Sequence, residues 1–259
     1  MEHSLTTVFV LLATVVQSVC FAQHDFKKTT AIYKRVGNLK IHTDVYRPLN
    51  KKVLPVVVWI HGGALIMGHR EGISGRVKQW AKENGCALVS IDYRLAPETK
   101  VPAIIEDLED AFRWIRGKGS KQFHLDAKRV AVTGGSAGGY MTMTAGYRVK
   151  PRVQVLLSFW GYGDLIGDWY SKPSPHPRHN SRKISKEEAW NQIDGTVISD
   201  SRDRKGNGGV FYQYSRQTGL FPNVISGWDP HKNPEKFYPY MAGKNVTGDY
   251  PPTAMIHGT

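Results

Sequence analysis

The order of apolar and polar positions along the chain predicts buried strands that alternate with helices. A continuous apolar run at 56–60 and mainly apolar runs at 87–91, 130–132 and 153–157 are typical of strands that are buried on both faces. Apolar residues recur at helical spacing in two segments between these runs: Ile73, Val77, Trp80 and Ala81 in the first, and Ile104, Ile105, Leu108, Ala111, Phe112 and Ile115 in the second. This alternation predicts the α/β class, with a mostly parallel central sheet and helices on both of its faces.

Glycine and proline indicate where several of these elements begin and end. Gly85 is suited to end the first helix, and Pro102 is suited to the first turn of the second. A third helix is expected from 137 to about 147. At the beginning of the domain, two strand-like pieces within 30–46 flank Gly37 and Asn38, and they predict an antiparallel hairpin at a sheet edge.

The alternation stops after the fourth strand. From about 160 to 250 the chain is polar, aromatic and rich in turns, with one clear helical piece near 185–193, where Ser185 and Glu188 fit a capping box. We interpret this segment as a cap that is inserted over the sheet. Residues 251–258 then predict the next central strand, so that 23–259 forms one α/β domain.

Length and composition are those of one globular domain. The chain has 259 residues, of which 41% are hydrophobic and 22% charged, and these values exclude a disordered protein. A net charge of +13 is compatible with an anionic partner such as nucleic acid or an acidic polysaccharide. Lysine and arginine are nevertheless spread along the chain without a long basic run, which favours a basic, solvated surface. We expect no nucleic-acid partner.

The first 22 residues predict a signal peptide. Residues 6–19 form an apolar stretch of signal-peptide length that is too short for a stable membrane span, and cleavage after Ala22 fits the small residue there. A lipoprotein anchor at Cys20 is less favoured, because the preceding residues lack the usual small-residue pattern. We therefore expect a secreted or periplasmic protein.

The chain has two cysteines, Cys20 and Cys86. The expected cleavage removes the first, and the second lies in an apolar run that is typical of a small core residue. Two cysteines that are used in this way provide neither a disulfide framework nor a cysteine-rich metal site.

Residues 134–138 read Gly-Gly-Ser-Ala-Gly and match the G-x-S-x-G pattern between a predicted strand and a predicted helix. Gly134 and Gly138 allow a sharp turn that exposes the Ser136 hydroxyl group at the helix N-terminus. The alternatives are an ordinary glycine-rich turn or a phosphate-binding loop. No lysine follows as in a P-loop, and the spacing does not fit a dinucleotide fingerprint, so that we identify Ser136 as the candidate nucleophile.

The segment His-Gly-Gly-Ala at 61–64 follows the first buried strand directly. Glycines in this position let backbone N–H groups point at a developing oxyanion, and the N–H after the nucleophile joins them. In isolation the segment would be interpreted as a tight turn without a catalytic role, but its combination with Ser136 favours an oxyanion hole. The expected donors are Gly63, Ala64 and Ala137, with His61 and Gly62 supporting the motif.

The two motifs together resemble the hormone-sensitive-lipase-like branch of the α/β-hydrolases, which includes bacterial secreted esterases and lipases. The segments 92–98 (DYRLAPE) and 102–111 resemble two further segments of that branch, in which Arg94 and nearby acids are expected to hold loops in place. The resemblance runs from about residue 40 to the end and is loose in the cap. It implies a serine carboxylic-ester hydrolase that acts through an acyl-enzyme on a small-molecule or polymer-linked ester, without a metal or an organic cofactor.

Two positions differ from the pattern of this branch. Ala64 stands where glycine is usual, and its methyl group is expected to narrow the acyl side of the pocket. Gly135 stands where aspartate is usual, and we expect the turn around Ser136 to survive this change.

The resemblance also implies a catalytic acid and a histidine, in the chain order serine, acid, histidine. The acid is expected just after the strand at 253–257 and the histidine after the following strand, so that both are expected beyond Thr259. We therefore expect the sequence to be a fragment that lacks the last strand and helix. No histidine within it is assigned to the triad: His257 is interpreted as structural, and His176 and His179 in the cap would need an unusual route to Ser136.

Two other functions remain open at this point. A serine peptidase of related fold would hydrolyse peptides without turning over esters. A catalytically inactive hydrolase-fold protein would bind a ligand or partner under the aromatic cap, and its serine would not react with a fluorophosphonate.

Overall fold

A computed structural model of the chain describes residues 26–258. The predicted signal peptide (1–22) and the alternative anchor at Cys20 lie outside the described residues. None of the helices between residues 26 and 258 has both the length and the apolar character that a membrane span requires.

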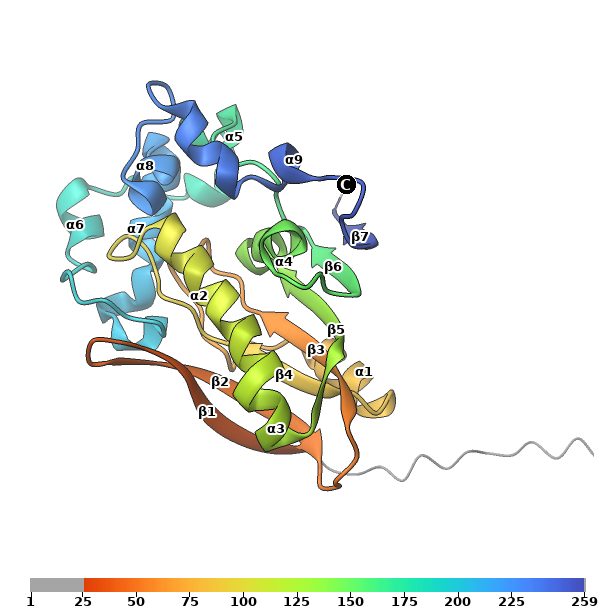
Figure 1. Cartoon of the computed structure of the whole chain (residues 1–259). Helices are drawn as coiled ribbons and strands as arrows, with labels where there is room; N and C mark the ends of the chain where they lie inside the picture. Colours follow the sequence, from red (N-terminus) through yellow and green to blue (C-terminus); the bar gives the residue numbers. More distant parts are fainter. Residues whose placement is uncertain (1–25, 259) are drawn as a thin grey trace, which may run out of the picture.

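Seven strands form one sheet in the order β1-β2-β4-β3-β5-β6-β7 (Figure 1). The strands are β1 (Phe26–Val36), β2 (Leu39–Pro48), β3 (Leu54–Ile60), β4 (Ala87–Ile91), β5 (Leu125–Gly135), β6 (Val155–Phe159) and β7 (Thr253–Ile256). Strands β1 and β2 form an antiparallel hairpin that turns at Gly37, where φ is 55°, and β2 is antiparallel to β4. The neighbours from β4 to β7 are parallel. The predicted fold class and the hairpin at the sheet edge are confirmed.

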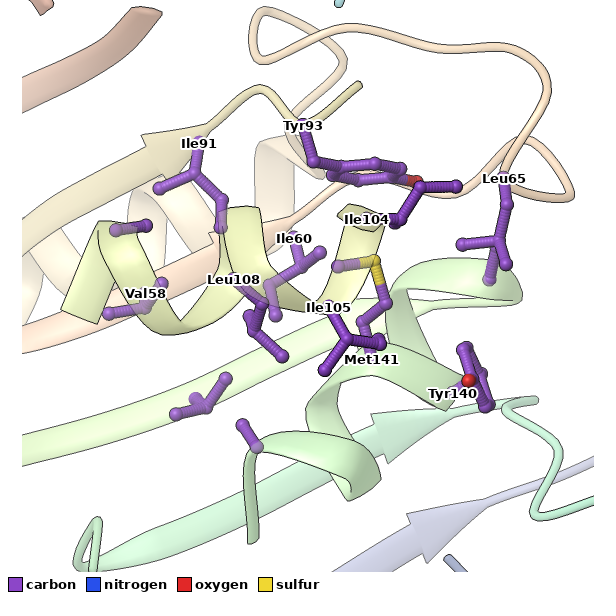
Figure 2. Close-up of a cluster of buried hydrophobic side chains, with 14 of the residues drawn as sticks. Val58, Ile60, Leu65, Ile91, Tyr93, Ile104, Ile105, Leu108, Tyr140 and Met141 are labelled. Atoms are coloured by element: carbon purple, nitrogen blue, oxygen red, sulfur yellow. The ribbon is translucent and has the colours of Figure 1, made fainter. Parts of the chain in front are cut away.

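Helices cover both faces of the sheet. Side chains of successive residues in β3 point to opposite faces, so that this strand contributes to the packing on both sides. The helices before the cap segment are α1 (Gly75–Glu83), α2 (Val101–Trp114), α3 (Ser120–Phe123), which follows a π-helical turn η1 (Ile115–Gly119), and α4 (Ala137–Arg148). On one face, Val58 and Ile60 belong to the main core with α2 and α4 (Figure 2). On the other, Val57 and Trp59 pack with Ala81 of α1 in a smaller cluster.

The apolar stripe predicted for the second helix is confirmed, since all six of its positions are buried. The stripe predicted for the first helix is too wide. Trp80 is 53% exposed, whereas Ala81 at the next position is buried against the sheet and Ile73 and Val77 pack against the same cluster. One step along a helix rotates the side chain by about 100°, and in α1 this step turns Trp80 to the solvent while Ala81 faces the sheet. Cys86 is buried, as predicted, and its burial raises the pKa of the thiol.

The segment from 160 to 250 contains short helices joined by turns, and it lies beyond one end of the sheet (Figure 1). Its helices are α5 (Asp168–Ser171), α6 (Lys186–Trp190), α7 (Gly209–Thr218), α8 (Phe221–Ser226) and α9 (Ala242–Asn245), with 3-10 turns η2 (Pro177–His179), η3 (Ser201–Asp203), η4 (Lys205–Gly208) and η5 (Pro234–Tyr240). Helix α6 matches the predicted helical piece, and its N-cap Ser185 accepts a hydrogen bond from the Glu188 N–H at 3.1 Å. We call residues 160–250 the cap segment.

An ion pair inside the domain holds the loop after β4 against α2. Asp107 is fully buried and accepts hydrogen bonds from the Arg94 N–H at 2.9 Å and from the Arg94 guanidinium at 2.8 Å. The Lys34 ammonium group donates to the same carboxylate at 2.6 Å. The expectation that Arg94 and a nearby acid hold this loop is therefore confirmed.

Replacement of Asp107 tests the contribution of this pair to stability. We expect Asp107→Ala to lower the free energy of unfolding by about 3–5 kcal/mol, because it leaves the Arg94 guanidinium buried without its carboxylate. Glu106→Ala is the matched control: its side chain is 61% exposed and lies 4.0 Å from Arg94, so that we expect a loss below about 1 kcal/mol. Urea unfolding measures both, and equal losses would contradict this account.

Candidate active site

Ser136 lies in a strained turn between β5 and α4. Its φ and ψ are 57° and −121°, a combination that residues other than glycine rarely adopt and that costs about 1–3 kcal/mol. Two hydrogen bonds hold the turn: the Ser136 N–H donates to the Phe159 carbonyl, and the Tyr140 N–H donates to the Ser136 carbonyl, both at 2.9 Å. The strand–turn–helix arrangement that the G-x-S-x-G pattern requires is therefore present.

The glycines of the motif are required because the end of β3 touches the turn. A Cβ atom on Gly138 would lie 2.0 Å from the Ile60 carbonyl oxygen, and one on Gly134 would lie 2.5 Å from the same atom. Gly62 approaches from the other side, since its Cβ would lie 2.7 Å from the Gly135 oxygen and 3.4 Å from the Ser136 Cβ. The segment 61–64 is thus in direct contact with Ser136.

The backbone N–H groups of Gly63, Ala64 and Ala137 make none of the hydrogen bonds formed within residues 26–258. The turn after β3 is closed through the Gly63 carbonyl, which accepts from Ile66 at 2.9 Å and from Met67 at 2.7 Å. Ala64 and Ala137 are buried. Buried N–H groups without a partner are rare in proteins, so that Ala64 and Ala137, with the half-buried Gly63 beside them, are candidate donors to an oxygen atom of a ligand.

His61, the first residue of the segment at 61–64, is held in place by its neighbours. Its ring stacks on Tyr93 with 4.2 Å between the ring centroids, and its Nδ1 lies 2.8 Å from the Gly62 oxygen. The Tyr93 hydroxyl group donates to the His61 carbonyl at 2.9 Å. Burial lowers the pKa of His61 from its ordinary value of 6.5 to about 4, so that the ring is neutral at pH 7.

Ser136 also lines a pocket of about 600 Å³ between the end of the sheet and the cap segment. The walls are largely aromatic. The lining residues are Ser136, Trp160, Gly161, Tyr162, Trp169, Tyr170, His176, Arg178, His179, Tyr212, Arg216 and His257. Ala64 is not among them, so that the narrowing of the acyl side by its methyl group stays a prediction.

Three histidines line the same pocket as Ser136. They are His176 and His179 of the cap segment, for which an unusual route to Ser136 was expected, and His257, which was interpreted as structural. They reach the pocket because β7 pairs with β6, with Phe159 opposite Ile256, and because the cap segment folds back over this end. That none of them belongs to the triad stays a prediction. No hydrogen bond among residues 26–258 joins a histidine to the Ser136 hydroxyl group.

Gly135 provides room for an aromatic side chain that the sequence analysis did not identify. A Cβ atom on Gly135 would lie 3.3 Å from the indole Nε1 of Trp160. Trp160 has a φ of 39°, and its N–H donates to the Ile256 carbonyl at 2.6 Å. The glycine that stands where the resemblance implies aspartate thus allows Trp160 to lie beside Ser136, the candidate nucleophile. The only sequence signal was this replacement itself.

Comparison with known proteins gives a match to one family model and sequence relatives of two kinds, esterases and polyketide synthases. The model of the BD-FAE family matches residues 43–173. Esterase LipI of Mycobacterium tuberculosis is 42% identical over 96 residues, which are 37% of this chain and 30% of LipI. The non-reducing polyketide synthase Preu6 of Preussia isomera is 30% identical over 67% of this chain and 9% of its own length. The chain thus spans less than a third of either relative.

Solved structures with a similar fold cover nearly the whole chain. A hyperthermophilic esterase from Pyrobaculum calidifontis superposes with a TM-score of 0.59 at 24% identity, over 90% of this chain and 66% of its own. An α/β-hydrolase superfamily protein from Enterococcus faecalis gives 0.66 at 23% identity, over 88% and 77%. These likenesses confirm the α/β-hydrolase fold.

The low pKa of His61 makes stability depend on pH. The unfolded chain binds a proton to this histidine below about pH 6.5, whereas the folded protein does so only near pH 4. Stability therefore decreases as the pH falls through this window, and we expect His61 to contribute about 2 kcal/mol of the loss between pH 7.5 and pH 5. Urea unfolding at both pH values measures it.

A substitution separates His61 from the other titrating groups. His61→Phe keeps a ring on Tyr93 but cannot titrate, so that the decrease in stability should shrink by about 2 kcal/mol. His124→Asn, at an exposed position with a φ of 48°, is the control and should retain the full decrease. A decrease that is unchanged in His61→Phe would contradict the assignment.

Proposed function

Because the chain belongs to the BD-FAE family, we propose that it is a carboxylic-ester hydrolase whose nucleophile is Ser136. The observation that carries the proposal is the strained backbone of Ser136 at the end of β5, next to unpaired N–H groups from the loop after β3. Relatives that are named esterases support the same chemistry.

In the proposed reaction, the Ser136 Oγ attacks the ester carbonyl carbon, and the carbonyl oxygen becomes an oxyanion. The N–H groups of Gly63, Ala64 and Ala137 donate to this oxyanion, and each such donor is typically worth about 3 kcal/mol in the transition state. When the carbon–oxygen bond to the alcohol breaks, the alcohol leaves and the acyl group stays on Ser136. Water then attacks the acyl-enzyme, and the acid is released.

The reaction also needs a general base, since a serine hydroxyl group is a weak nucleophile on its own. The base takes the Ser136 proton during attack and returns it to the departing alcohol. The resemblance to hormone-sensitive-lipase-like enzymes implies a histidine in this role, with an acid that orients it. Its pKa near neutrality would let it accept and donate the proton at the pH of the reaction.

We further propose that the protein is exported and acts outside the cytoplasm on small-molecule or polymer-linked esters. The apolar segment at 6–19 and the cleavage position after Ala22 support the export. The open, aromatic pocket beside Ser136 supports an ester that carries a flat or cyclic group.

Replacement of the nucleophile tests the proposal. In the full-length protein, Ser136→Ala should lower kcat for 4-nitrophenyl acetate at least about a thousandfold, because no acyl-enzyme can form. Ser120→Ala, which removes a hydroxyl group at the junction of η1 and α3, is the control and should leave turnover unchanged. Turnover that persists in Ser136→Ala would refute the role of this serine.

Labelling with a fluorophosphonate distinguishes the remaining functions. Wild-type protein should be labelled and Ser136→Ala should not. A folded wild-type protein that is not labelled would favour an inactive hydrolase-fold binding protein. Labelling combined with cleavage of peptides but not of esters would favour a peptidase.

A further inference from the structure

The pocket that Ser136 lines carries positive charge without a carboxylate to balance it. Two of the lining residues, Arg178 and Arg216, are arginines, and none of those within the described part of the chain is aspartate or glutamate. Arg178 is exposed at the rim, whereas Arg216 on α7 is only 1% exposed.

The guanidinium of Arg216 has few partners for a buried cation. Its Nη2 donates to the Trp169 carbonyl at 2.6 Å, and its central carbon lies 4.8 Å and 4.7 Å from the ring centroids of Trp169 and Tyr170. Its Nε is buried and has no partner among residues 26–258. A guanidinium has five N–H groups in a fixed fork, so that most of its capacity is unused.

The other buried arginines have a carboxylate partner or several hydrogen bonds, although the Nε of Arg204 and two nitrogens of the half-buried Arg116 also lack a partner among the described residues. Arg94 pairs with Asp107, and Arg204 pairs with Glu98. Arg47 has no carboxylate but donates to four backbone carbonyl oxygens. A buried charge is costly unless it is paired with an opposite charge and hydrogen-bonded. Within the described residues Arg216 has no carboxylate partner, and it donates fewer hydrogen bonds than Arg47, Arg94 or Arg204.

His179, which lines the same pocket, has a lowered pKa. Burial, followed by the positive charges of Arg216 and Arg178, lowers the pKa of His179 to about 4, and its Nδ1 lies 2.8 Å from the Ser174 hydroxyl group. The ring is therefore neutral at pH 7 and adds no further positive charge.

We propose that this pocket binds the anionic group of an ester substrate, a carboxylate or a sulfate, on Arg216, with Arg178 at the rim. The planar fork of an arginine matches two oxygens of such a group. The rings of Trp160, Trp169 and Tyr212 then pack against the body of the ligand. The inference rests on the proposed function, because the bound molecule is a substrate only if Ser136, which lines the same pocket, reacts with it.

Direct binding tests the inference without requiring turnover. Benzoate and benzenesulfonate are titrated into the full-length protein in low salt, with benzamide as the neutral probe of the same shape, and calorimetry or the fluorescence of Trp160 and Trp169 reports binding. We expect at least one of the two anions to bind about tenfold more tightly than benzamide. The two anions distinguish a planar carboxylate from a tetrahedral sulfate. Added salt should weaken only the anions.

Arginine variants assign the binding to the pocket. Arg216→Gln should lower the anion-to-amide affinity ratio about tenfold, and Arg216→Lys should retain part of it, since the charge remains but the fork is lost. Arg178→Gln should also lower the ratio, and it tests the rim independently if the buried variant does not fold. Arg182→Gln removes an exposed cap charge outside this pocket, and its ratio should equal that of the wild type.

The outcomes separate this inference from the proposed function. Equal binding of the anions and benzamide, or a ratio that Arg182→Gln lowers as much as the pocket variants do, would overturn the inference even if esters are hydrolysed. Tight, Arg216-dependent binding of an anion without hydrolysis of any ester would support the anion site and count against the esterase. With both correct, 4-acetoxybenzoate should be hydrolysed with a higher kcat/KM than its methyl ester.

Discussion

The candidate site depends on the close approach of two backbone segments, the end of β3 and the turn around Ser136. The Ile60 carbonyl lies where a Cβ atom on Gly134 or Gly138 would have to be, so that only glycine allows the contact. This contact holds Ser136 in its strained conformation and at the same time places the loop at 61–64 beside it. The proposed nucleophile and the proposed oxyanion donors are thus positioned by one packing constraint.

Buried ion pairs extend this arrangement from the sheet to the cap segment. Asp107 fixes the loop after β4 through Arg94. Arg204 of the cap segment donates to the Ile66 carbonyl at 2.6 Å and to the Ala96 carbonyl at 3.0 Å, and it pairs with Glu98. The cap segment is thereby attached to the loop after β3 and to the loop after β4. Arg216, by contrast, is a buried cation that lines the pocket and has no carboxylate partner among the described residues.

Much of the fold could be predicted from the sequence, because apolar runs and helical spacing reflect burial directly. The strands at 56–60 and 87–91 and the stripe of α2 follow from this rule. The cap segment could not be predicted in the same way, since its helices are short and held by aromatic and polar contacts that leave no periodic signal. His176, His179 and His257 reach the pocket only through the pairing of β7 with β6 and the return of the cap, which are tertiary events.

The most direct test of the account is to trap the acyl-enzyme. Full-length protein is mixed with 4-nitrophenyl acetate, quenched in acid during the first turnover and digested, and mass spectrometry locates the acetyl group. The account predicts one acetyl group on the peptide that contains Ser136, formed at the rate of the initial burst of 4-nitrophenol. Hydrolysis that proceeds without an acetylated intermediate, or with the acetyl group on another residue, would contradict it.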